Sequence, residues 1–205
     1  MKTIDIDTPH GPAKAHVHAA KGAKAALVLG HGAGGGGIEA PDLVAAMEVA
    51  LEHEVSVVLI EQPYLVAGRR SPAPARQLDA AWTAAIEQLR ANELKGLPLV
   101  VGGRSLGARV ACRTAAATGA VAVLCLAFPV HAPGRGDDPK SSRLEELEQV
   151  QVPVLVVQGE RDPFGMPPPG RDRTVVKVPG DHGLKADLEA VAAAVRAWLP
   201  GAVGR

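Results

Sequence analysis

The sequence predicts an α/β fold in which a mainly parallel β-sheet carries helices on both of its faces. One observation behind this prediction is a series of short, continuous apolar segments, which are typical of strands buried on both faces. A second is that these segments alternate with segments whose apolar residues recur at helical spacing. With 205 residues and neither an internal repeat nor a long linker, the chain is expected to form a single domain, residues 1–205.

The expected elements follow one another in a regular order. Residues 3–7 and 13–19 alternate polar and apolar side chains around a turn with Pro and Gly, which predicts a β-hairpin within residues 1–20. Further strands are expected at 25–30, 55–60, 97–101, 120–128, 152–158 and 174–178. Helices are expected at 41–51, 76–93, 106–118, 144–150 and 184–198. Pro200-Gly201 is expected to end the last helix, and residues 201–205 to form a disordered tail.

Composition and charge exclude several classes of partner. Lys plus Arg and Asp plus Glu each number 22, so the net charge is zero and neither nucleic acid nor an anionic membrane is expected as a partner. The first residues lack the apolar core of a signal peptide, and the apolar run 120–130 is shorter than the roughly 20 residues of a membrane-spanning helix. We therefore expect a cytoplasmic location. Cys112 and Cys125 lie among apolar residues and are interpreted as small core residues.

The turn around Ser105 has the pattern of a nucleophile elbow. An apolar strand leads into Gly103, Ser105 and Gly107 in the order Gly-x-Ser-x-Gly, and an Ala-rich helical segment follows. Glycine removes the Cβ atoms that would clash where so sharp a turn brings the backbone together. This strand–turn–helix context predicts a nucleophilic serine. The alternative is an ordinary strand-to-helix turn with the serine as helix cap.

An aspartate and a histidine follow two later strands and complete a possible catalytic triad. Ser105, Asp162 and His182 each come directly after an expected strand, and ligands of open α/β sheets bind at that edge. They stand in the order Ser, Asp, His of an α/β-hydrolase triad. His182 would accept the serine proton, and Asp162 would orient the imidazole. Glu160 is a rival carboxylate, and His131 is the alternative base.

Attack on a carbonyl also requires donors for the oxyanion that forms. The backbone N–H groups of Leu106, at the start of the helix, and of Ala33, in a Gly-rich loop, are the expected donors. No metal or organic cofactor is needed for this chemistry, and none is expected.

The same Gly-rich loop also matches a dinucleotide-binding pattern. Gly30, Gly32 and Gly35 follow a strand in the order Gly-x-Gly-x-x-Gly, and Glu61 ends the next strand, where a ribose-binding carboxylate belongs. Against this interpretation, the following helix begins only near Pro41, so a pyrophosphate would lose the helix N-terminus. The pattern also leaves the serine, aspartate and histidine unexplained.

Several motifs resemble the α/β-hydrolase superfamily in its dienelactone-hydrolase-like part. Within it they are similar to the branch of the Tex-type proteins and a regulatory subunit of the non-specific-lethal histone acetyltransferase complex. The resemblance runs from about residue 25 to the last helix and implies a three-layer α/β-hydrolase fold. Dienelactone hydrolases use a cysteine nucleophile, whereas Ser105 here favours acyl-ester chemistry. The motifs are His31-Gly32-Ala33-Gly34, Gly102-Gly103-Arg104-Ser105-Leu106-Gly107, Phe128-Pro129-Val130-His131 and Gln158-Gly159-Glu160-Arg161-Asp162-Pro163-Phe164-Gly165.

The sequence thus predicts a serine hydrolase, an esterase or thioesterase-like enzyme for small acyl substrates. The alternative is a catalytically silent binding or scaffold protein, because some members of the resembled branch are scaffold subunits. No segment is long enough for a lid domain, so we expect an open site walled by residues 62–75 and 129–142. Arg104 is expected to pair with a carboxylate or with backbone carbonyls under the loops, and Glu61 and the neighbours of Asp162 are candidate partners. The oligomeric state is left open.

Overall fold

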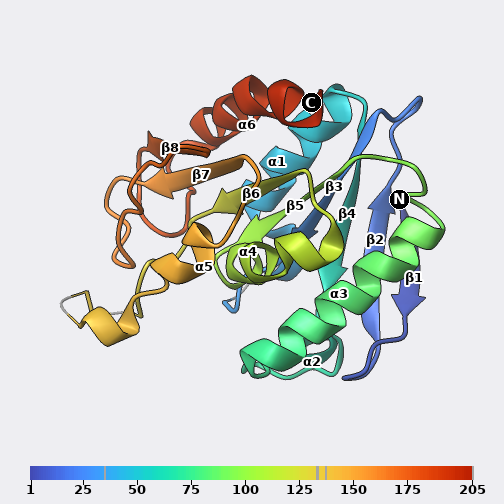
Figure 1. Cartoon of the computed structure of the whole chain (residues 1–205), viewed down its shortest axis with the longest axis horizontal. Helices are drawn as coiled ribbons and strands as arrows, with labels where there is room; N and C mark the ends of the chain where they lie inside the picture. Colours follow the sequence, from blue (N-terminus) through green and yellow to red (C-terminus); the bar gives the residue numbers. More distant parts are fainter. Residues whose placement is uncertain (35, 133, 137, 205) are drawn as a thin grey trace.

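The protein is built on an eight-stranded sheet with the strand order β1-β2-β4-β3-β5-β6-β7-β8 (Figure 1). The computed structural model describes residues 1–34, 36–132, 134–136 and 138–204. The strands are β1 (Lys2–Ile6), β2 (Ala13–His18), β3 (Ala25–Gly30), β4 (Val55–Glu61), β5 (Leu99–Arg104), β6 (Ala122–Leu126), β7 (Val154–Gly159) and β8 (Arg173–Val178). The helices are η1 (Gly37–Glu39), α1 (Pro41–Glu52), α2 (Pro63–Val66), α3 (Ala75–Ala91), α4 (Leu106–Thr118), η2 (Pro139–Ser141), α5 (Leu144–Glu148) and α6 (Leu188–Val203).

The sheet is mainly parallel, as predicted. Strands β1 and β2 form an antiparallel hairpin, and β2 pairs antiparallel with β4. From β4 to β8 every neighbouring pair is parallel, so these strands end at the same edge of the sheet. The functional groups that follow those strands are therefore brought together at one edge.

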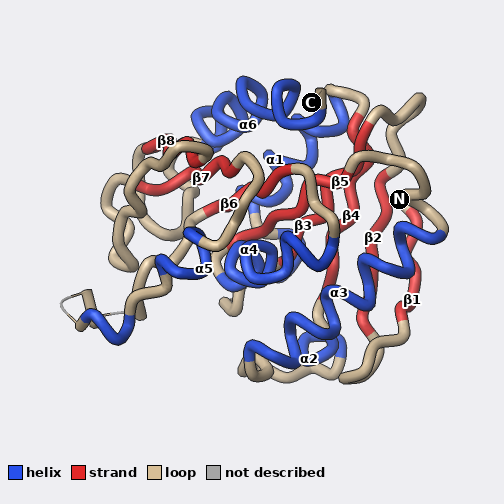
Figure 2. The backbone as a smooth tube through the Cα atoms, in the orientation of Figure 1, coloured by secondary structure: helices blue, strands red, loops and turns tan. Residues whose placement is uncertain are grey.

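Helices cover both faces of the sheet and form three layers with it (Figure 2). Alternate side chains of the central strands enter two separate cores. Val28 and Val101 pack on the face of α3 and α4 around Trp82, whereas Leu27 and Val100 pack on the face of α1 and α6. Both faces of the central strands are thus buried, which explains their continuous apolar sequences.

The last helix differs from the prediction at both ends. Leu184 is buried, but it lies in a turn with φ of 49°, and α6 begins only after Asp187, whose carboxylate accepts a hydrogen bond from the Ala190 N–H. The helix also continues through Pro200 to Val203, so the predicted end at Pro200-Gly201 is wrong. Burial of the last turn at Leu199 and Ala202 offsets the single helical hydrogen bond that proline removes.

The expected disordered tail at 201–205 is accordingly wrong as far as Val203, and Arg205 lies outside the described residues. Two segments expected to be loops contain short helices, α2 after β4 and η2 before α5. Between β6 and β7 the described chain forms only η2 and α5, so no lid domain is inserted there. None of the helices in the described ranges combines the length and apolar character that spanning a membrane requires.

Candidate active site

Ser105 occupies a strained turn between β5 and α4. Its φ of 51° and ψ of −105° are unusual for a residue with a side chain. A Cβ atom on Gly107 would lie 2.2 Å from the Gly30 carbonyl oxygen, and one on Gly103 would lie 2.4 Å from the same atom. Both positions therefore require glycine, and the turn holds the serine at the carboxyl edge of the sheet.

The structure brings Ser105, His182 and Asp162 into one hydrogen-bonded chain. The Ser105 Oγ lies 2.9 Å from the His182 Nε2, and the His182 Nδ1 lies 2.9 Å from the Asp162 Oδ2. A carboxylate only accepts, so Nδ1 carries the proton and Nε2 is free to accept the serine hydroxyl. This arrangement lets the imidazole take a proton from the serine.

Asp162 is held by two further hydrogen bonds. Its side chain is fully buried, and Oδ1 accepts from the Phe164 backbone N–H at 2.9 Å. Oδ2 accepts from the Gln158 Nε2 at 2.8 Å. Gln158 is itself buried at the end of β7, and sequence reasoning gave it no role. The available signal was a glutamine that ends an otherwise apolar strand.

Arg104 supports His182 from the other side. Its Nη2 donates to the His182 carbonyl oxygen at 3.0 Å, and its Nε lies 3.0 Å from the carboxylate of Asp42. The expected partner Glu61 is wrong, because its carboxylate instead contacts the His16 Nε2 at 2.6 Å. Glu61 ends β4 beside β2, where His16 lies, and β3 separates β4 from β5, the strand that carries Arg104.

Asp42 is fully buried in the first turn of α1. Burial raises the pKa of its carboxyl group, and the positive charge of Arg104 opposes this rise. The N-terminus of α1 also favours a negative charge at this position. Sequence reasoning gave Asp42 no role, because an acidic residue at a helix start is ordinary.

The two expected oxyanion donors belong to the same cleft as Ser105. Ala33 and Leu106 both line it, and Leu106 is the first residue of α4. In the ranges that the structure describes, neither backbone N–H donates a hydrogen bond to another group. Both groups are therefore available to a ligand at Ser105.

Residues 23–186 match the family model of the α/β hydrolase domain. The chain belongs to this family. No curated protein matches the sequence significantly.

Solved structures of other α/β hydrolases have the same fold at low sequence identity. An α/β serine hydrolase without a lid from Xanthomonas campestris is 21% identical, with a TM-score of 0.78 over 100% of this chain and 95% of that chain. Est1E from Butyrivibrio proteoclasticus is 16% identical, with a TM-score of 0.77 over 100% of both chains. A dienelactone hydrolase from Anabaena variabilis is 18% identical, with a TM-score of 0.74 over 98% of this chain and 96% of that chain.

The alternatives that the sequence left open lie apart from the serine of this α/β hydrolase. Glu160 is exposed, and the His131 Nδ1 bonds to the Ala132 carbonyl oxygen. His31 is buried, with Nδ1 donating to the Gly32 carbonyl oxygen at 2.8 Å and Nε2 accepting the Gln62 N–H at 3.1 Å. Burial lowers the pKa of His31, which is therefore a neutral support of the Gly-rich loop.

The dinucleotide pattern includes Gly35, which lies outside the described residues. After it the chain forms η1, and α1 begins only at Pro41, so the pattern does not lead directly into a helix. Within the described ranges no group of three or more His, Cys, Asp or Glu side chains is arranged to hold a metal ion. The Cys112 and Cys125 sulfurs lie 3.5 Å apart in the core as free thiols.

Ser105 and His182 line a cleft of about 620 Å³. Pro72 and Ala73 line it from the segment before α3, and Pro129 lines it from the segment after β6. Phe164 also lines the cleft and packs on His182, with ring centroids 4.1 Å apart. The cleft thus lies between the two segments expected as walls, and its volume suits a small ligand.

Proposed function

We propose that this α/β hydrolase is a serine hydrolase that cleaves small acyl esters or thioesters through Ser105, His182 and Asp162. The observation that carries the proposal is the continuous hydrogen-bonded chain from the Ser105 Oγ through the His182 imidazole to the Asp162 carboxylate. The serine-hydrolase and dienelactone-hydrolase names of proteins with the same fold support it.

The reaction follows from these contacts. The Ser105 Oγ bonds to the carbonyl carbon while its proton passes to the His182 Nε2, and Asp162 stabilises the imidazolium that forms. The carbonyl oxygen takes up the electron pair and accepts from the N–H groups of Ala33 and Leu106. The bond to the alcohol or thiol then breaks, and His182 returns the proton to that leaving group. Water, deprotonated by the same histidine, hydrolyses the acyl-enzyme and regenerates the serine.

The shape of the cleft supports a preference for short acyl groups. Its walls come from loops and from helices α3 and α4 rather than from a lid, so no interfacial activation is expected. The volume of about 620 Å³ suits a small ester better than a long-chain lipid. Esters and thioesters share the same mechanism, so the proposal covers both. Membership of the Tex-type branch and a cytoplasmic location remain predictions from the sequence.

Labelling with a fluorophosphonate and hydrolysis of p-nitrophenyl esters of increasing chain length test the proposal. Wild type is expected to take the label and to cleave short esters fastest. Ser105→Ala is expected to lose both activities by orders of magnitude, with circular dichroism unchanged. Thr174→Ala, which removes an exposed hydroxyl on β8 away from the cleft, is the control and should retain both. A wild-type protein that neither takes the label nor cleaves any ester or thioester would favour the scaffold alternative.

A further inference from the structure

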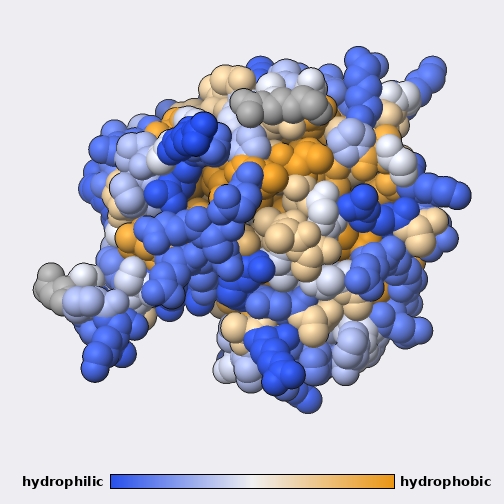
Figure 3. All heavy atoms as spheres, viewed as in Figure 1, coloured by the Kyte–Doolittle hydropathy of each residue, from blue (hydrophilic) through white to orange (hydrophobic). Residues whose placement is uncertain are grey.

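The cleft that holds Ser105 has a second, charged region. Besides Arg104, three arginines line it, Arg109 and Arg113 from α4 and Arg143 directly before α5. Helix α5 and the segment before it present a hydrophilic surface in the space-filling view (Figure 3). Arg143 comes from a different part of the chain than Arg109 and Arg113, and none of the three takes part in the proposed serine chemistry.

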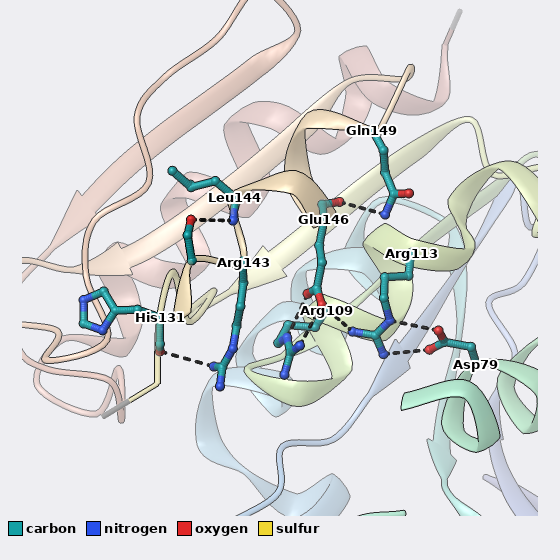
Figure 4. Close-up of polar contacts among 9 residues, drawn as sticks. Asp79, Arg109, Arg113, His131, Arg143, Leu144, Glu146 and Gln149 are labelled. Carbon is teal, nitrogen blue, oxygen red and sulfur yellow. Dashed lines mark hydrogen bonds and ion pairs between the residues drawn. The ribbon is translucent and has the colours of Figure 1, made fainter. Parts of the chain in front are cut away.

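Two of the arginines are fully paired. Arg109 forms a two-bond contact with Glu146, at 2.8 and 2.6 Å. Arg113 forms a two-bond contact with Asp79, at 2.8 and 2.7 Å, and a further bond to Glu146 at 3.1 Å. Figure 4 shows this network running from α3 through α4 to α5. The network fixes both guanidinium groups and neutralises two of the three positive charges.

Arg143 has no such partner in the described ranges. Its Nη1 donates to the His131 carbonyl oxygen at 3.2 Å, and it forms no ion pair with a described carboxylate. Figure 4 shows its side chain extending from the start of α5 toward that carbonyl. Burial and the positive charges of Arg109 and Arg113 lower the pKa of Arg143, against the opposite effect of Glu146. Among the described residues, the cluster thus has one more cation than carboxylates, and Arg143 is the cation without a carboxylate partner.

We propose that Arg143 binds a carboxylate of the substrate, so that the preferred esters carry one negative charge. A guanidinium presents paired donors that match the two oxygens of a carboxylate, and a single excess charge calls for a single anionic group. Leu78, Leu106 and Ala73 line the same cleft and suit a short apolar link between ester and carboxylate. This inference rests on the proposed function and names the substrate class of that site.

Matched pairs of esters measure the preference. On the acyl side, mono-p-nitrophenyl adipate is compared with p-nitrophenyl adipamate, in which a carboxamide replaces the carboxylate. On the alcohol side, 4-carboxyphenyl butyrate is compared with 4-carbamoylphenyl butyrate. Wild type is expected to show about a tenfold higher kcat/KM for the anionic member of at least one pair. The pair that responds shows which side of the ester carries the charge, and added salt should reduce the preference.

Substitutions connect the preference to Arg143. Arg143→Gln should abolish the ratio of the two kcat/KM values, whereas Arg143→Lys should keep part of it because the charge remains. Arg171→Gln is the matched control, because Arg171 is exposed before β8, at the strand end opposite the site, and should leave the ratio unchanged. A ratio near one for both pairs in wild type, or an undiminished ratio in Arg143→Gln, overturns the inference.

A binding measurement separates this inference from the proposed function. Calorimetry should show that Ser105→Ala binds 4-phenylbutyrate at least about tenfold more tightly than 4-phenylbutanamide. Adding Arg143→Gln to this variant should remove the difference in affinity. If wild type cleaves no ester but this difference is found, the proposed function fails and the carboxylate site stands. If esters are cleaved without preference and the two ligands bind alike, the proposed function stands and the carboxylate site fails.

Discussion

Two buried aspartates hold His182 from two sides, and they do so in different ways. The Asp162 carboxylate contacts the imidazole directly, at 2.9 Å from Nδ1. The Asp42 carboxylate acts at a distance, because it pairs with Arg104, which donates to the backbone carbonyl oxygen of His182. The Asp162 contact orients the imidazole and selects its tautomer. The Asp42–Arg104 contact fixes only the position of the loop that carries His182.

The environments of the two carboxylates also differ. Asp162 accepts hydrogen bonds on both oxygens, from the Phe164 N–H and from Gln158. Asp42 lies within ion-pair distance of Arg104, yet neither of its oxygens has a well-aligned hydrogen-bond partner in the described ranges. Asp42 therefore depends on electrostatic attraction, from Arg104 and from the N-terminus of α1. The carboxylate beside the imidazole is held by aligned hydrogen bonds, whereas the one that positions the loop is held mainly by charge.

The largest expected effect distinguishes the two aspartates by activity. Asp162→Asn should lower kcat for ester hydrolysis on the order of 10³- to 10⁴-fold, because an amide can hold the histidine in the wrong tautomer. Asp42→Asn should lower it by about tenfold or less, because Arg104 can still donate to the His182 carbonyl oxygen. Steady-state kinetics on one p-nitrophenyl ester measures both, with circular dichroism as the control for folding. Equal losses in the two variants would contradict the division of roles.

A second, smaller effect concerns stability. Arg104→Met removes the cation that pairs with the buried Asp42 and should lower the free energy of unfolding by about 3 kcal/mol. Adding Asp42→Asn should recover most of this loss, because no buried charge is then left unpaired. Urea denaturation of both single variants and the double variant measures the coupling. Additive effects would mean that the ion pair does not stabilise Asp42.

Topology made much of the site predictable from sequence. Parallel strands end at one edge, so residues that directly follow β5, β7 and β8 had to lie near one another. The proximity of Ser105, Asp162 and His182 was predicted in this way, together with the glycines that the turn requires. The strands of the sheet were predictable because their continuous apolar sequences reflect burial on both faces.

The side-chain partners were not predictable, because they depend on packing between distant segments. Asp42 meets Arg104 only because α1 packs beside the end of β5, whereas Glu61, at a strand end and apparently better placed, pairs with His16. Arg143 lies in the same cleft as Arg109 and Arg113 of α4 because of the path that the chain takes before α5, and no local sequence pattern indicates this path. Local pattern also misplaced the start of α6, because Leu184 has helical spacing but is buried in a turn.

His31 extends the comparison to a buried group held by neutral hydrogen bonds, and it gives the smallest predicted effect. Its pKa is lowered by burial, so between the folded pKa and about 6.5 the unfolded chain binds a proton that the folded chain does not. The contribution of His31 to the free energy of unfolding is therefore complete above about pH 6.5 and falls as the pH drops, by at most about 1.4 kcal/mol per pH unit.

Urea denaturation of wild type and His31→Gln at pH 7.5 and 5.5 tests this pH dependence. The advantage of wild type should shrink at pH 5.5, because Nε2 can accept the Gln62 N–H only while it is unprotonated. An advantage that stays constant or grows on acidification would mean that His31 is charged in the folded protein.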